Sequence, residues 1–350
     1  MKIEELKEQD CAAWDAYVHT SPAGLPQHLS GWRSVLRNTY GYETSYLFAN
    51  CEAATNALPK IVGVMPLFFV KSLLTGHTAM TMPGGLCADN EIVAQALIER
   101  GWELARQAQA QRFVVQDSRR PWPGPLHTSS QHVNWLVDVR MGEAALSKQL
   151  DRNIRRQIRM ARDNQLRAEI DRTPRLLSDF YEVFSRFTHQ SGTPVFGCHF
   201  LEQVIKQFPS GYNIVIIYKE QQPIGGYFQL EAGKTNYGVW GATLPEFLPL
   251  RPVYLAYWEI LLDTIAHQFE FLDMGRSPVD SNASAFKRQW GGVCTPIYQQ
   301  IASQQAAPQS LTAQTQTDSK FHTFRRIWPK VPFPIAQFLG PKLRRHVPFA

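Results

Sequence analysis

A run of glycine and polar residues follows an apolar segment at Leu272–Gly292 (LDMGRSPVDSNASAFKRQWGG) and carries the densest set of chemically useful side chains. Asp273 could act as a base or orient a partner, and Lys287 could place a cation beside a developing negative charge. The guanidinium groups of Arg276 and Arg288 suit bidentate contacts with phosphate or carboxylate. Because α/β folds bind ligands where strands end, the run predicts a catalytic and binding loop. The alternatives are a solvated, capped loop and a Lys287 whose stem covers the surface.

A second candidate is a basic helical face. At 100° per residue, Arg152, Arg156 and Arg159 share one side of a helix, with Arg155 and Arg162 beside them. Such a face could contact tRNA phosphates or an anionic acceptor. The alternative is a solvated face with acidic residues nearby.

The remaining candidates lie on two other elements. Tyr237 and Trp240 stand three residues apart on one expected strand, so we expect them to face opposite sides, and only one of them to line a given cleft. In the first half, an expected helix carries Trp32, Arg33 and Arg37. The two arginines lie four residues apart and are candidate anion contacts next to Trp32.

The elements that must position these residues alternate between helix and strand patterns. The chain has 350 residues, enough for about two domains. Hydrophobic periodicity predicts an α/β fold in two halves of similar plan. Expected helices are 3–18, 30–38, 91–109, 143–166, 174–190, 199–207 and 252–268, and expected strands are 42–49, 60–69, 113–116, 133–137, 213–218, 223–231, 235–240 and 269–274.

Composition excludes several classes of protein. No apolar stretch is long enough for a transmembrane helix, and the charged N-terminus is unlike a secretory signal. The five cysteines are scattered and the ten histidines form no metal-binding motif, so we expect reduced thiols and no metal. The net charge of +6 arises within residues 302–350, so the basic balance describes the tail and not a nucleic-acid-binding body.

The motifs resemble those of the FemAB family. Gly275-Arg276-Ser277 followed by Phe286-Lys287 and Trp290-Gly291 resembles that family's closing motif, and residues 152–161 resemble its linking helix. Trp32 after Gln27, Pro66-Leu67 and residues 238–242 fit as well, so the resemblance spans about residues 25–300. Trp328-Pro329 and the residues after them resemble the branch associated with exosortase/PEP-CTERM exopolysaccharide systems.

The resemblance implies two tandem GNAT-like domains, each a mixed central sheet flanked by helices. The expected parts are a first domain at 1–145, a linking basic helix at 146–166, a second domain at 167–301, a polar linker at 302–319 and a basic aromatic tail at 320–350. Family members transfer an aminoacyl group from aminoacyl-tRNA to an amine on a peptidoglycan precursor. Here it implies direct acyl transfer to a cell-envelope or exopolysaccharide precursor, with a functional lysine at Lys287.

We therefore expect a cytoplasmic transferase with no bound cofactor, using aminoacyl-tRNA or acyl-CoA as its donor substrate. The tail's aromatic and basic residues suit contact with the inner membrane, and its prolines exclude one continuous helix. A CoA-dependent N-acyltransferase is one alternative. The run most similar to a CoA pyrophosphate loop is residues 288–293. It ends in Val and leads into an expected strand, which weakens the CoA-dependent alternative. A non-catalytic assembly protein of a polysaccharide-export system is the other alternative.

Overall fold

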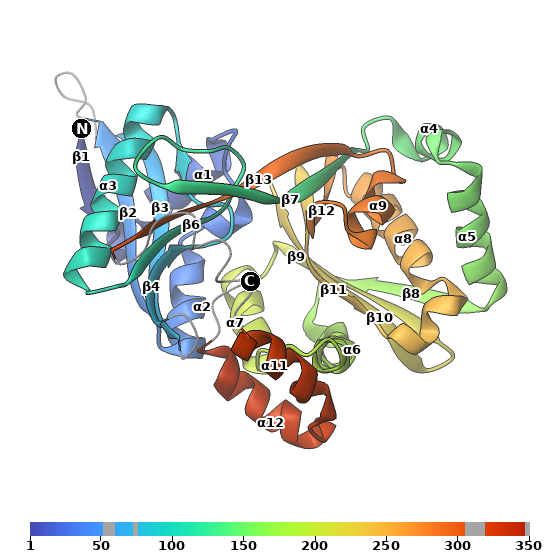
Figure 1. Cartoon of the computed structure of the whole chain (residues 1–350). Helices are drawn as coiled ribbons and strands as arrows, with labels where there is room; N and C mark the ends of the chain where they lie inside the picture. The colour runs from blue at the N-terminus through green and yellow to red at the C-terminus, as the bar shows by residue number, and fades with distance from the viewer. Residues whose placement is uncertain (52–59, 73–75, 305–318, 347–350) are drawn as a thin grey trace. The chain divides into compact units, whose positions relative to one another are not determined.

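The computed structural model describes residues 1–51, 60–72, 76–304 and 319–346. By the contacts among their residues, these fall into two compact units (Figure 1). The first unit contains residues 1–131, 296–324 and 342–350, and the second contains 132–295 and 325–341. The sequence placed the first boundary at 145, whereas the structure assigns 132–145 to the second unit.

The first unit is built on a sheet with the strand order β1-β2-β3-β4-β6-β13. All neighbours are antiparallel except β4 and β6, which pair in parallel through three residue pairs. Its elements are β1 (Lys2–Glu5), α1 (Cys11–Thr20), α2 (Gly31–Tyr40), β2 (Glu43–Cys51), β3 (Lys60–Ser72), β4 (Gly76–Thr81), β5 (Cys87–Ala88), α3 (Glu91–Gln107), β6 (Arg112–Ser118) and β13 (Val293–Ser303).

The second unit repeats this plan with the strand order β7-β12-β11-β10-β9-β8. Here β11 and β12 form the parallel pair, again through three residue pairs, and the other neighbours are antiparallel. Its elements are β7 (His127–Asp138), α4 (Gly142–Gln149), α5 (Arg152–Asp163), β8 (Leu166–Asp171), α6 (Leu177–Gln190), α7 (Cys198–Gln207), β9 (Tyr212–Lys219), β10 (Gln222–Ala232), β11 (Thr235–Thr243), α8 (Pro252–Ala266), β12 (Phe271–Pro278) and α9 (Asn282–Arg288).

Each sheet completes itself with a strand from the other half of the chain. β7 follows β6 in sequence but pairs with β12, while β13 follows β12 but pairs with β6. This exchange explains why the units divide near residues 131 and 295, since residues 296–303 belong to the first sheet. The expected tandem pair of α/β domains is confirmed, with the last strand of each exchanged.

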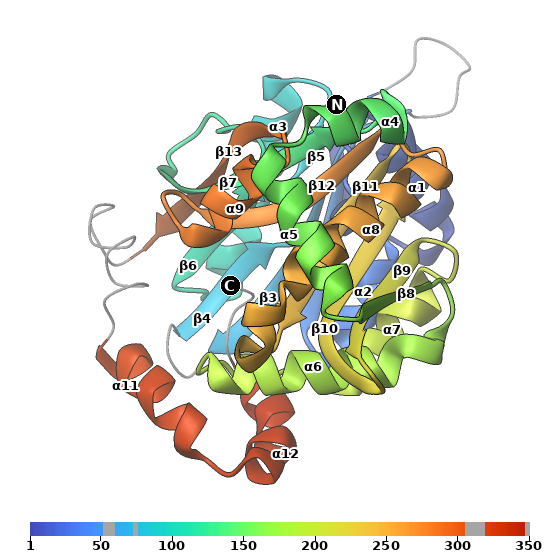
Figure 2. The same cartoon turned by 90° about the vertical axis from the view of Figure 1, so that its right-hand side faces the viewer.

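Strand alternation separates the two faces of the second sheet. Val215 and Ile217 on β9 pack with α5 and α8, whereas Ile216 and Gly226 lie toward Phe180 on α6. Figure 2 shows α5 lying beside α8 on the near face of this sheet. This arrangement decides which side chains share the space under α8.

The long basic helix expected over 143–166 is two helices. Leu150 is extended (ψ 137°), and the Asp151 side chain accepts a hydrogen bond from the Asn153 backbone N–H, which caps the start of α5. The apolar stripe of α5 packs on α8 through Ile154 and Ile158. A cap residue inside a continuous helical pattern therefore divided one expected element into two.

Residues 325–341 of the tail belong to the second unit. The described part of the tail forms α11 (Ser319–Ile327) and α12 (Phe333–Arg344), so the expected helix interruption is confirmed. Trp328 is only 4% exposed, and the His189 ring on α6 bonds the Val331 carbonyl at 2.9 Å. The His189 ring also packs against Trp328 and Phe333. Most of the linker expected at 302–319 lies outside the described residues.

Within the described ranges, every helix is too short or too polar to cross a bilayer.

Candidate active site

The second sheet opens where its two parallel strands separate. β11 and β12 pair only as far as Tyr237 and Asp273, and a cavity of about 910 Å³ begins beyond this point. Gly275 has φ +74°, and a Cβ there would lie 2.5 Å from the Gly238 carbonyl oxygen. A left-handed backbone this close to its neighbour requires glycine. The glycine of the Gly-Arg-Ser motif therefore shapes the wall of the cavity.

Lys287 enters this cavity from α9 and is only 8% exposed. Its ammonium donates hydrogen bonds to the carbonyl oxygens of Gly275 (2.8 Å) and Arg276 (3.1 Å). Burial lowers the pKa of Lys287 to about 8, and the nearby charge of Asp273 opposes this shift. The group is thus a fixed, poorly hydrated cation rather than a surface lysine, and its pKa allows proton exchange near neutral pH.

Asp273 is 3% exposed, and its carboxylate accepts hydrogen bonds from two residues near the cavity wall. One carboxylate oxygen accepts the Gly275 backbone N–H at 2.8 Å, and the other accepts the Asn134 side-chain amide at 3.1 Å. These contacts fit the orienting role considered from sequence, because they fix the turn that carries the Lys287 acceptors.

An aromatic cluster lies beside Lys287 at the cavity, with Tyr254, Tyr257 and Phe286 in the lining. Tyr254 and Tyr257, one helical turn apart on α8, each contact the Phe286 ring with centroids 5.2 and 5.3 Å away. Trp290 is fully buried beneath them and contacts Phe286. The rings of Tyr254, Tyr257 and Phe286 form an apolar part of the cavity wall.

A bulge in β11 changes the expected placement of Tyr237 and Trp240. Trp240 pairs with Phe228 and Tyr237 with Leu230, while Val239 is the extra residue between them. Their partners are two residues apart and share a face, so the expectation of opposite faces is wrong. Trp240 lines the cavity, and Tyr237 does not.

Arg276 and Arg288, the two arginines of the motif, differ in their position relative to the cavity. Arg276 is exposed at the rim and lines the cavity, whereas the exposed Arg288 lies outside the lining. Gly291 (φ +77°) then leads the chain into β13.

Three further candidates, Trp32, Arg33 and Arg37, belong to the first unit. Trp32 is 2% exposed, and its indole N–H donates to the Pro26 carbonyl at 2.9 Å. Arg33 and Arg37 line a separate cavity of about 430 Å³ in that unit. Arg33 donates to the Leu6 carbonyl at 2.9 Å.

The basic helix presents Arg152, Arg156 and Arg159 to solvent on α5. Arg156 contacts the Asn153 side chain at 3.2 Å, and the neighbouring Arg162 pairs with Glu259 at 3.1 Å. Since α5 packs on α8 and α8 lines the cavity, the basic face belongs to the same unit as Lys287.

Sequence reasoning missed several lining residues. Tyr254 and Tyr257 were expected only as residues of the helix over 252–268, which begins at Pro252. Arg251, with φ +68°, also lines the cavity, and so does Gln229 on β10. No local motif distinguishes these residues from core positions.

Comparison with known proteins agrees with this geometry. Residues 148–288 match a family model described as an acetyltransferase (GNAT) domain. The second unit therefore has a GNAT-like fold. The match includes the separated parallel strands and ends one residue after Lys287. Comparison with curated protein sequences finds no match.

Solved structures extend the similarity over most of the chain. FemX aligns with a TM-score of 0.64 and 14% identity, covering 91% of this chain and all of that one. A tandem GNAT protein from the clavulanic acid biosynthesis pathway aligns at 0.55 and 11%, covering 87% and 99%. L-PGS from Bacillus licheniformis aligns at 0.54 and 9%, covering 82% and 95%. At these identities the similarity concerns the fold, which is the tandem GNAT arrangement.

Proposed function

We propose that the chain transfers an acyl or aminoacyl group to an amine on a cell-envelope or exopolysaccharide precursor. The observation that carries this proposal is the buried Lys287 ammonium, held by two backbone carbonyls in a cavity between separated parallel strands. A GNAT-type domain over residues 148–288 supports acyl transfer as the reaction class.

In the proposed reaction, the acceptor amine attacks the acyl carbonyl carbon and a new C–N bond forms. The carbonyl electron pair moves to oxygen, and Lys287 stabilises that negative charge. When the oxygen returns its pair, the bond to the leaving group breaks. The leaving group takes the proton that the amine loses, either directly or through water. Arg276, exposed at the rim, would contact an anionic part of a substrate.

Aminoacyl-tRNA is the donor we favour, and the exposed basic face of α5 supports it. The connection from β11 to α8, residues 244–251, contains two prolines and no glycine, so it offers no flexible glycine loop for a pyrophosphate. Arg33 and Arg37 in the first unit would contact an anionic group of the acceptor.

The donor is tested by offering radiolabelled aminoacyl-tRNA and radiolabelled acetyl-CoA separately to the purified protein with an acceptor-rich membrane extract. Amide-linked label from aminoacyl-tRNA is expected. Label from acetyl-CoA alone would replace the donor but keep acyl transfer. Label from neither would favour the non-catalytic assembly role.

We also propose that the protein works at the cytoplasmic face of the inner membrane. The described tail exposes Ile335, Phe338 and Leu339 on one side of α12, at 49%, 66% and 37%. Nearby lysines and arginines suit an anionic lipid surface. Phe338→Asp in the full chain should reduce flotation with anionic liposomes, whereas Gln337→Asp, an exposed neighbour, should reduce it less. Equal flotation of both variants would remove the membrane contact from the proposal.

A further inference from the structure

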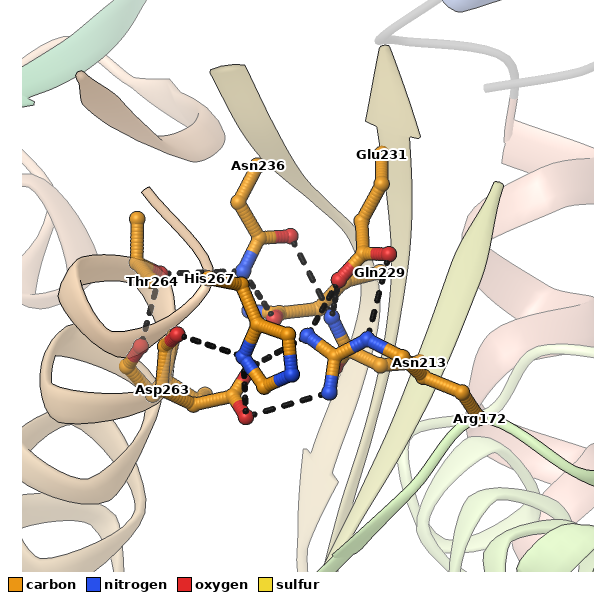
Figure 3. Close-up of polar contacts among 9 residues, drawn as sticks. Arg172, Asn213, Gln229, Glu231, Asn236, Asp263, Thr264 and His267 are labelled. Carbon is orange, nitrogen blue, oxygen red and sulfur yellow. Dashed lines mark hydrogen bonds and ion pairs between the residues drawn. The ribbon is translucent and has the colours of Figure 1, made fainter. Parts of the chain in front are cut away.

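A buried polar network crosses the face of the second sheet that α8 covers (Figure 3). At one end, the Arg172 guanidinium bonds both Glu231 (2.6 Å) and Asp263 (2.7 Å). Asn213 and Asn236 are fully enclosed, with no exposed surface. Such a network fixes the orientation of a side-chain amide wherever its partner can only donate or only accept a hydrogen bond.

The hydrogen-bonding capacity of Thr264 fixes which way the Asn236 amide points. The Thr264 hydroxyl has one hydrogen and donates it to the Ile260 carbonyl at 2.7 Å. The Asn236 atom 3.0 Å from this hydroxyl must therefore be the donor, Nδ2. At the other end, Asn213 turns its Nδ2 toward the Glu231 carboxylate at 2.8 Å, since a carboxylate only accepts.

The Asn236 orientation then fixes Gln229. The same Nδ2 of Asn236 lies 2.7 Å from the Gln229 side chain, so the Gln229 atom there must be the acceptor, Oε1. The Gln229 NH₂ group consequently points the other way. Among the described residues, Nε2 of Gln229 has no hydrogen-bond partner.

The free NH₂ group faces the cavity that contains Lys287. Gln229 lines that cavity and is only 2% exposed. Nε2 of Gln229 is not fully enclosed, so part of its surface is open to the cavity. Oδ1 of Asn213, by contrast, is both enclosed and, among the described residues, unpartnered. A buried amide donor that is held in one orientation and lacks a protein partner takes its acceptor from the cavity, either water or a bound ligand.

We propose that Gln229 is a catalytic residue that donates a hydrogen bond to the carbonyl oxygen of the acyl group being transferred. This inference rests on the proposed acyl transfer. Asn236 is a positioning residue, because it keeps Gln229 from presenting its own oxygen to the substrate. The acyl oxygen gains negative charge as the amine attacks, so a fixed N–H donor binds the transition state more tightly than the ground state. Lys287 and Gln229 then supply two donors from different elements.

The kinetic test compares Gln229→Met with Gln157→Met, which removes another buried glutamine outside the cavity. We expect Gln229→Met to lower kcat about 100-fold with little change in KM, the effect typical of losing one oxyanion donor. Gln157→Met should keep the wild-type kcat. Asn236→Asp should match the loss in Gln229→Met, because a carboxylate there would turn the Gln229 NH₂ inward. An unchanged kcat in Gln229→Met would overturn the inference.

A second readout does not depend on turnover. In protein labelled with ¹⁵N-glutamine, the side-chain signal missing from Gln229→Met identifies Gln229. We expect this signal to shift when acetyl-CoA or an amide-linked aminoacyl-adenosine is added, while the Gln157 signal stays. A shift without any transfer by the wild type would refute the proposed function and support the Gln229 contact. No shift with either probe would overturn the inference about Gln229.

Discussion

Replacing Lys287 by methionine should change how stability depends on pH. The pKa of Lys287 is lowered from 10.5 to about 8 by burial. Each pKa unit corresponds to about 1.4 kcal/mol, so holding this ammonium charged costs the fold about 3 kcal/mol at neutral pH. Between pH 8 and 10.5 the unfolded chain keeps the proton while the folded chain releases it. The wild type should therefore gain about 3 kcal/mol relative to the variant as pH rises through this window.

At pH 7 the two effects of the substitution oppose each other. Methionine removes the buried charge but leaves the Gly275 and Arg276 carbonyls without their donor, at about 1–3 kcal/mol each. We expect Lys287→Met to be about as stable as the wild type below pH 8.

The assay is denaturant unfolding of wild type, Lys287→Met and Lys148→Met at several pH values from 7 to 10.5. Lys148 is an exposed lysine on α4, so its variant should follow the wild-type curve. Parallel curves for wild type and Lys287→Met would refute the argument, since they would show that Lys287 is not desolvated.

Two further substitutions test the framework around the site. Gly275→Ala should lower the free energy of unfolding by more than Gly142→Ala in thermal or denaturant unfolding. Both glycines have positive φ, a backbone conformation that costs a non-glycine residue about 1–3 kcal/mol. Only the Gly275 substitution also places a Cβ against a backbone oxygen of β11. Arg172→Leu should lower the free energy of unfolding by about 3–5 kcal/mol, because it leaves two nearly buried carboxylates without their cation. Arg140→Leu breaks an exposed ion pair and should cost under about 1 kcal/mol in the same experiment. Equal losses within either pair would contradict these assignments.

Local pattern was sufficient for most of the elements that carry the site. The apolar segments of β9 and β10 and the α8 helix that begins at Pro252 appear close to where periodicity placed them. The motif also pointed to Lys287, which the structure buries at the cavity. These features depend on short-range sequence, which a single chain displays directly.

The features that were missed depend on partners distant in sequence. Nothing local shows that β7 joins β12 rather than β6, because strand exchange is decided by pairing across the chain. The bulge at Val239 is equally hidden, since alternation assumes a regular strand. The strands are interrupted by the polar residues Asn213, Gln229 and Asn236. Their hydrogen-bond network can be recognised only in the folded chain, where α8 places Thr264 against Asn236.

The most direct test of the account is the single-turnover rate of amide formation by the full-length wild type, Lys287→Met and Lys148→Met, using the donor that labels the acceptor extract. We expect a rate about 100-fold or more lower for Lys287→Met and an unchanged rate for Lys148→Met. Comparable rates for Lys287→Met and the wild type would show that acyl transfer does not depend on the buried ammonium in this cavity, contradicting the account.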